Sequence, residues 1–274
     1  MKYLCNVSGG LCSFWAWKRT IDQFGAANVV PIFADVMIED KDLYAFNEQA
    51  AAHLGTPITR ISLELSPWEL FRREGLLGNN RFPICSTKLK REPLNAWMAG
   101  RYELNRNQTN AFLEEGTVVL GFDWTEHHRV DEFQAAHPTW RVLAPMTEKP
   151  LWDKCRMMVE AEALGFARQR LYALGFPHAN CGGGCVKAGI SHFVNLYHRL
   201  PEVFWKWAAE ELYTRDSMRA QGIEKWHFTI LKDRRGKETK PLLLMELAYR
   251  IAAGEDLPKD EWGGCGCGGA ETIN

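Results

Sequence analysis

The chain has 274 residues, of which 46% are hydrophobic and 24% are charged, and its formal net charge at pH 7 is −1. This composition is ordinary for a globular protein, and the near-zero net charge excludes a general attraction to nucleic acid or to a membrane surface. No apolar run approaches the roughly 20 residues that span a bilayer, and the N-terminal residues do not form a secretory signal. We therefore expect a cytoplasmic protein with no membrane partner.

The first 150 residues alternate short apolar runs with amphipathic stretches. The pattern predicts strands at 3–7, 29–34, 58–63, 118–121 and 142–144, and helices at 14–24 and 42–54. Strands separated by helices form a parallel sheet, which binds ligands at the carboxyl ends of its strands. The predicted fold class is α/β, with a Rossmann-like parallel five-stranded sheet flanked by helices.

The remainder of the chain has a different pattern. It is mostly helical after Leu151, with one further strand expected at His227–Leu231. We therefore expect an α/β core at 1–150, a mainly helical C-terminal extension at 151–253, and a Cys/Gly-rich tail at 254–274. No internal repeat or linker interrupts these parts.

The segment between the first expected strand and helix reads Ser8-Gly9-Gly10-Leu11-Cys12-Ser13. Glycines let backbone N–H groups approach a phosphate, and the N-terminus of the following helix adds a partial positive charge. Ser8 and Ser13 can add hydroxyl donors. The same pattern is also typical of a tight turn that caps a helix with Ser13, so both interpretations stand at this point.

Four of the eight cysteines lie in glycine-rich stretches, two by two. Cys181 and Cys185 enclose three glycines, and Cys265 and Cys267 are surrounded by glycines near the end of the sequence. In a reducing compartment, paired cysteines bind metal or do redox chemistry more often than they form disulfides. The pattern predicts a metal or iron–sulfur centre, or a redox-active thiol pair.

Further segments match one known family in the right order along the chain. They are Ser8–Ser13, which resembles the PP-loop Ser-Gly-Gly-x-Asp-Ser; Phe33–Asp35; Cys85–Leu94, which is similar to Cys-x-x-x-Lys-x-x-Pro-Leu; Gly121–Glu126 with Arg129; Ala144–Thr147; and Leu171–Phe176, which leads into Cys181. The chain thus resembles the phosphoadenosine phosphosulfate (PAPS) reductase-like proteins of phage and bacteria, within the adenine nucleotide alpha-hydrolase (PP-loop ATPase) superfamily. The resemblance covers most of the chain and implies a HUP-type sheet.

The resemblance implies that an adenylyl nucleotide binds across the carboxyl edge of the sheet. The nucleotide would be ATP, with Mg²⁺, or an adenylylated sulfate (APS or PAPS). The residues expected to contact it are Ser8, Gly9, Gly10, Cys12, Ser13, Asp35, Gly121 and Glu126. Lys88 and Arg129 would neutralise phosphate or sulfate oxygens, so both are candidate catalytic residues.

The sequence departs from the family pattern at three places. Cys12 stands where the PP-loop has Asp, which weakens the expectation of ordinary Mg²⁺-assisted ATP cleavage. Asp123 stands where the family has Arg, which weakens the expectation of sulfate recognition. Ile84 precedes Cys85 where cluster-bearing reductases have a second cysteine, and three residues instead of two separate Cys181 from Cys185.

The resemblance also gives the cysteines candidate roles. Cys85, Cys181 and Cys185 align with metal ligands of the family, and Cys265 or Cys267 could be a fourth. A [4Fe–4S] cluster is the expected cofactor, with zinc as the alternative because four cysteine sulfurs also form a structural zinc site. Alternatively, Cys265 and Cys267 correspond to the catalytic nucleophile that the reductases carry near a mobile C-terminus.

These features favour an enzyme, either a PAPS-reductase-family oxidoreductase or an ATP-dependent sulfurtransferase. The first would cleave adenylylated sulfate reductively, with a thioredoxin-type reductant as partner. The second would thiolate a nucleobase or nucleic acid through adenylylation, with a sulfur donor as partner. A third hypothesis is a non-catalytic nucleotide- or nucleic-acid-binding protein with a structural metal, for which Cys12 is the best support.

Overall fold

The computed structural model describes residues 2–101, 116–234 and 238–263. Its centre is a parallel five-stranded sheet with the order β3-β2-β1-β4-β5. The strands are β1 (Lys2–Asn6), β2 (Val29–Asp35), β3 (Thr59–Ser62), β4 (Gly116–Val119) and β5 (Arg141–Leu143). The predicted α/β fold with a Rossmann-like parallel sheet is confirmed.

The central strand β1 lies between β2 and β4. Tyr3 pairs with Val29 on one side, and Lys2 pairs with Gly116 on the other. The chain therefore runs outward through β2 and β3, and then returns to the other side of β1 for β4 and β5. Such a reversal is a topological switch point, where the loops after the two neighbouring strands separate and leave a crevice for a ligand.

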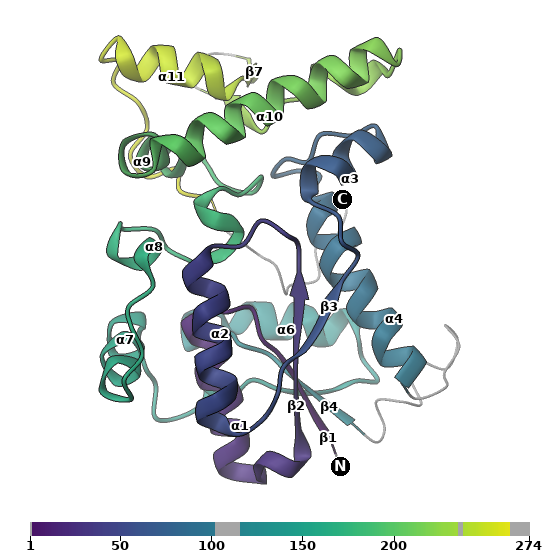
Figure 1. The fold of residues 1–274 in the computed structure, drawn as a ribbon, viewed down its shortest axis with the longest axis vertical. Coiled ribbons are helices and arrows are strands. Elements are labelled where there is room, and N and C mark those ends of the chain that lie inside the picture. The colour runs from purple at the N-terminus through teal and green to yellow at the C-terminus, as the bar shows by residue number, and fades with distance from the viewer. Residues whose placement is uncertain (1, 102–115, 235–237, 264–274) are drawn as a thin grey trace.

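Helices cover both faces of the sheet. Cys5 and Val7 pack with residues of α1 (Leu11–Phe24), α2 (Lys41–Leu54) and α7 (Lys154–Ala163). On the opposite face, Leu4 and Ile32 pack against residues of α4 (Glu92–Arg101) and α6 (His127–Ala136). Figure 1 shows α2 to the left of the strands and α4 to their right. Successive strand residues point to opposite faces, so both faces of β1 are apolar.

A second helical part lies beyond the carboxyl edge of the sheet, where the arrow of β2 points in Figure 1. Phe193, Leu196 and Phe204 are fully buried in its core. Its helices are α3 (Pro67–Glu74), α8 (Arg170–Ala173), α9 (Ile190–Arg199), α10 (Pro201–Ala220) and α11 (Leu244–Ala252). Among the described residues, the short helical turns are η1 (Ala26–Asn28), η2 (Ser86–Arg91), η4 (Trp124–Glu126), η5 (Pro145–Thr147), η6 (Asn180–Gly183) and η7 (Glu224–His227).

The strand predicted at His227–Leu231 is wrong. His227 ends the turn η7, and the observed strand β6 (Leu231–Asp233) pairs antiparallel with β7 (Lys240–Leu242). Before this strand, the backbone N–H of Ile230 donates to the carboxylate of Glu211 on α10 at 2.9 Å. A side chain, and not a neighbouring strand, satisfies this part of the backbone.

The division into core, extension and tail stays a prediction, and residues 264–274 lie outside the described part of the chain. Within the described residues, no helix has both the length and the apolar character needed to cross a membrane.

Candidate functional site

The loop Ser8–Ser13 lies at the carboxyl end of β1 and leads into α1. Gly9 has a φ of +79°, and a Cβ there would lie 2.3 Å from Leu43 Cγ, so only glycine fits. The Ser13 hydroxyl accepts from the Ser8 backbone N–H at 3.1 Å and donates to the Gly10 carbonyl at 2.8 Å. The serines thus hold the loop against the first turn of α1, where backbone N–H groups have no acceptor within the helix.

This loop opens onto a cavity of about 640 Å³, which we call the main cavity. Residues at the ends of three strands border it, including Asn6, Ala34 and Leu120. Four cationic side chains also line it: Lys90, Arg129, Lys154 and Lys187. Glu126 is the one carboxylate among its described lining residues. The surplus of cations beside a helix N-terminus makes the main cavity suited to an anionic ligand.

Arg129 is held in place at the wall of the main cavity. Its guanidinium pairs with the Glu126 carboxylate and lies over the Phe122 ring, 4.1 Å from the ring centroid. Stacking and ion pairing together restrict the guanidinium to one plane, which prepares it for bidentate contact with an oxyanion. Arg129 and Glu126, both candidate ligand contacts, therefore line the same cavity as the Ser8–Ser13 loop.

Lys88, a candidate catalytic residue, does not line the main cavity, whereas Lys90 of the same helical turn does. The Lys88 side chain is 44% exposed, pairs with Glu92 at 3.7 Å, and does not line the main cavity. The Lys90 side chain is buried and reaches the Glu39 carboxylate at 3.2 Å. Both lysines lie in η2, which is a π-helical turn. Such a turn alters the angular phase of its side chains, and the family pattern does not contain that information.

Lys154 and Lys187 were not predicted as ligand contacts. Lys154 is the first residue of α7, and Lys187 follows the cysteine pair at 181–185. Neither lies in a segment whose spacing indicates anion binding, because tertiary packing alone brings them to the main cavity. The position of Lys187 two residues after Cys185 was the only available signal.

Asp35, expected beside the adenosine, is engaged with protein groups at the end of β2. Its carboxylate accepts from the Met37 backbone N–H at 2.8 Å, the Tyr44 hydroxyl at 2.7 Å and the Arg60 guanidinium at 2.8 Å. Burial alone would raise the pKa of Asp35, but these three donors outweigh it and lower the pKa. Ala34, not Asp35, lines the main cavity.

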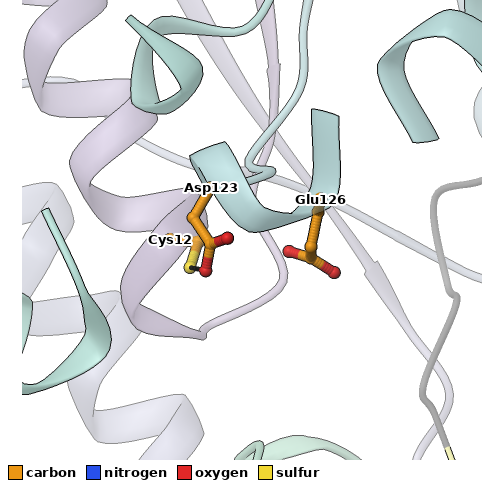
Figure 2. Close-up of side chains that lie close together, drawn as sticks. All are labelled: Cys12, Asp123 and Glu126. Carbon is orange, nitrogen blue, oxygen red and sulfur yellow. Dashed lines mark hydrogen bonds between the residues drawn. The ribbon is translucent and has the colours of Figure 1, made fainter. Parts of the chain in front are cut away.

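Two of the departures from the family pattern meet in space. The Cys12 sulfur lies 3.7 Å from the Asp123 carboxylate, and Figure 2 shows the two side chains in contact, with Glu126 nearby on the same short turn as Asp123. The ligand atoms of Cys12, Asp123 and Glu126 all lie within 4.8 Å of one another, a spacing that could hold a metal ion. Cys12, which stands where the PP-loop pattern has Asp, thus has a carboxylate beside it, from Asp123 at the start of η4.

The Cys12 thiol is protonated at neutral pH in this arrangement. Burial, and secondarily the charge of Asp123, raise its pKa to about 12. Gly121 permits the close approach of the two segments, because a Cβ at Gly121 would lie 2.6 Å from Ser13 Cα. The glycine predicted to contact the nucleotide is therefore also required for packing of the loop.

Cys85, Cys181 and Cys185 border a second cavity, which we call the cysteine cavity. Its other walls are largely apolar and include Ile38 and Trp207. Three thiols from two separate segments border this apolar site, and thiolates are the usual ligands of an iron–sulfur cluster. Their sulfur atoms do not all lie within 4.8 Å of one another, unlike the ligand atoms of Cys12, Asp123 and Glu126. The volume is about 20 Å³, so a four-iron cluster can enter only if the walls move apart, whereas a single ion needs less room.

The glycines between Cys181 and Cys185 are explained by close packing. Cys181 itself has a left-handed φ of 56°. A Cβ on Gly182 would lie 2.8 Å from the Ile38 carbonyl oxygen, and one on Gly184 would lie 2.1 Å from the Trp207 ring. The loop is therefore fixed against α10 and against the segment after β2, with its two cysteines in set positions.

Cys265 and Cys267 lie outside the described residues. The last described residue, Gly263, lines the main cavity and forms an isolated β-bridge with Ala188. A hydrogen bond from the Gly189 N–H to the Trp262 carbonyl at 2.9 Å supports this bridge. The chain is thus anchored at the main cavity two residues before Cys265.

No protein-family model matches the chain, and no curated protein matches it. Among solved structures, the chain is similar to a phosphoadenylyl-sulfate (PAPS) reductase from Candida auris, solved as a phosphate complex. The two share 13% sequence identity and a TM-score of 0.44, over 68% of this chain and 83% of that chain.

Proposed function

We propose that this chain is a PAPS-reductase-like enzyme that binds an adenylyl nucleotide in the main cavity. One observation carries the proposal: the Ser8–Ser13 loop and four cationic side chains converge on one cavity at the topological switch point of the sheet. Anions bind at such helix N-termini, and ligands of parallel sheets bind at such switch points.

In the proposed complex, phosphates lie against the loop Ser8–Ser13. Arg129, Lys90, Lys154 and Lys187 neutralise phosphate or sulfate oxygens, and the adenosine lies near the end of β2, close to Asp35. Charge-assisted hydrogen bonds from these side chains would hold the nucleotide in one orientation. The same cations would stabilise the negative charge that develops on the leaving nucleotide.

In the reductive reaction, a thiolate of Cys265 or Cys267 attacks the sulfur of an adenylylated sulfate. A sulfur–sulfur bond forms, the bond between that sulfur and the phosphate oxygen breaks, and the nucleotide leaves with the bonding electron pair. A dithiol reductant of the thioredoxin type then attacks the cysteine sulfur, releases sulfite and becomes a disulfide. The anchoring of Gly263 at the main cavity supports delivery of the nucleophile from this tail.

Cys85, Cys181 and Cys185 would hold a [4Fe–4S] cluster, or zinc as the alternative, with Cys265 or Cys267 as a candidate fourth ligand. When bound, a cluster would supply redox-active or Lewis-acidic iron beside the nucleotide. Lys90 and Lys187 line both cavities, which supports a functional connection between the cysteines and the nucleotide.

A second candidate is ATP-dependent sulfur transfer to a nucleobase or nucleic acid. The group formed by Cys12, Asp123 and Glu126 favours it, because carboxylates beside a phosphate loop suit the Mg²⁺ that accompanies ATP. A nucleotide- or nucleic-acid-binding protein without catalysis is the third candidate.

Product release separates these candidates. Purified protein is incubated with PAPS or APS and a dithiol reductant, and separately with ATP, Mg²⁺ and nucleic acid as the acceptor, while sulfite and pyrophosphate are measured. Sulfite from the first mixture supports the reductase, and pyrophosphate from the second supports sulfur transfer. Nucleotide binding by calorimetry without either product supports the binding protein. Failure of all three nucleotides to bind would contradict the proposed function.

Metal content tests the cysteine assignment. Anaerobically purified protein is expected to hold about four irons per chain if it carries a single cluster, and Cys181→Ser or Cys185→Ser is expected to lose them. Cys5→Ser serves as the control, because Cys5 is buried in β1 and burial raises its pKa to about 12. Stoichiometric zinc, with no iron after reconstitution, would reject the cluster in favour of the zinc alternative.

A further inference from the structure

The main cavity and the cysteine cavity share a wall. Lys90 and Lys187 line both cavities. Close packing forms part of this wall, since the loop at 181–184 approaches the segment between β2 and α2 at Gly182 and Ile38. The next residue of that segment, Glu39, has a side chain with no exposed surface. A fully buried carboxylate in a wall between two candidate sites requires a physical explanation.

The two oxygens of Glu39 have partners that belong to different sites. Oε1 accepts from Lys90 Nζ at 3.2 Å, and Oε2 accepts from the backbone N–H of Cys181. Removing one partner of a buried ion pair leaves an uncompensated charge, which is strongly unfavourable. The position of Lys90 at the main cavity and the position of the Cys181 backbone therefore depend on the same carboxylate.

We propose that Glu39 is a positioning residue that couples nucleotide occupancy of the main cavity to the conformation of the cysteine loop. This inference rests on the proposed function, namely that the main cavity binds an anionic nucleotide. A bound phosphate or sulfate shares the Lys90 ammonium with Glu39. The buried carboxylate then depends more on its other donor, and it holds the Cys181 N–H more firmly.

The coupling acts in both directions. If the nucleotide strengthens the bond between Glu39 and the Cys181 N–H, then any ligand that fixes the Cys181 loop raises the affinity for nucleotide by the same factor. Glu39 would thus make occupancy of the cysteine cavity favourable for nucleotide binding, although its own carboxylate contacts neither ligand.

Hydrogen exchange at the Cys181 amide tests the coupling directly. Exchange is measured at single-residue resolution in the full chain, with and without saturating PAPS or ATP. Nucleotide is expected to slow exchange at this amide about fivefold or more, in line with typical coupling between sites. In Glu39→Gln, the uncharged side chain no longer attracts Lys90, and the nucleotide-dependent change is expected to disappear. A general loss of stability would instead accelerate exchange throughout the chain.

Two further variants complete the test. Glu162→Gln is the matched control, because it removes a carboxylate from an exposed ion pair with Arg168 at 2.7 Å, and it should retain the wild-type response. Lys90→Met removes the lysine partner of Glu39, and its effect is measured without nucleotide. In the free protein, this variant should slow exchange at the Cys181 amide. Of the two donors to Glu39, only that amide is then left.

The outcomes distinguish the two proposals. Nucleotide that binds wild-type protein without changing Cys181 exchange overturns the coupling, as does a change that persists in Glu39→Gln. If nucleotide fails to bind, the proposed function is contradicted instead. The Lys90→Met variant then tests only whether Glu39 links Lys90 to the Cys181 amide. Unaltered exchange at the Cys181 amide in Lys90→Met overturns the proposed positioning role of Glu39. If Glu39→Gln does not fold, the wild-type and Lys90→Met measurements still decide.

Discussion

Lys154 is the residue whose role in anion binding is easiest to isolate. It lines the main cavity from the first turn of α7 and belongs to none of the segments that resemble a family motif. A hydrogen bond to a charged group contributes about 1.5–3 kcal/mol. Lys154→Met should therefore raise the dissociation constant for PAPS or ATP by about 10- to 100-fold, as measured by calorimetry.

A matched substitution controls for the loss of a positive charge. Lys18 lies on α1 and pairs with Asp22 at 2.8 Å, away from the cavity lining, so Lys18→Met should bind nucleotide as the unaltered chain does. The comparison also ranks the lysines, because Lys154→Met should weaken binding more than Lys88→Met. The opposite order would favour the family pattern over the observed geometry.

At the scale of elements, the loop between Cys181 and Cys185 depends on its packing against α10. Gly184→Ala places a methyl group within 2.1 Å of the Trp207 ring, and overpacking of this kind typically destabilises by about 1–3 kcal/mol. We expect lower stability in urea and loss of bound metal, because the loop must move. Gly222→Ala, where a Cβ meets nothing within 4 Å, should lose stability through its φ of +72° but retain metal.

Another element contact makes stability depend on pH. Burial raises the pKa of Glu211 on α10 to about 7, although hydrogen bonds from the N–H groups of Ile230 and Leu244 partly offset it. Between pH 4.5, the ordinary pKa of the unfolded group, and pH 7, the folded chain binds more protons than the unfolded chain. This contribution to stability is therefore complete below about pH 4.5 and is lost as the pH rises through 7.

Urea unfolding across this pH range tests whether stability falls as the pH rises. The free energy of unfolding of the unaltered chain should fall by up to about 3 kcal/mol relative to that of Glu211→Gln as the pH rises. Parallel curves for the two proteins would show that Glu211 does not titrate in this window.

At the scale of the whole molecule, the sequence predicted the sheet well because apolar runs and helical periodicity are local signals. The Ser8–Ser13 loop was found for the same reason, since its glycines and serines are adjacent. Which other side chains line the main cavity depends on tertiary packing and on the angle at which each side chain leaves its helix. Lys187 reaches the main cavity through the packing of a distant loop, and Lys90, not Lys88, lines that cavity from a π-helical turn. The contact of Cys12 with Asp123 joins residues 111 positions apart, and no local pattern predicts it.

The strand order has a consequence for how the protein is made. β1 pairs with β4, so the centre of the sheet cannot form until Gly116 has been synthesised and can pair with Lys2. Contacts of such long range form late, because the intervening chain must first be closed into a loop. During synthesis, the serine loop emerges first, but the wall that carries Arg129 does not yet exist. If nucleotide binds as proposed, it would therefore stabilise only a chain that has reached the second half of its sheet, and it would not protect shorter nascent chains.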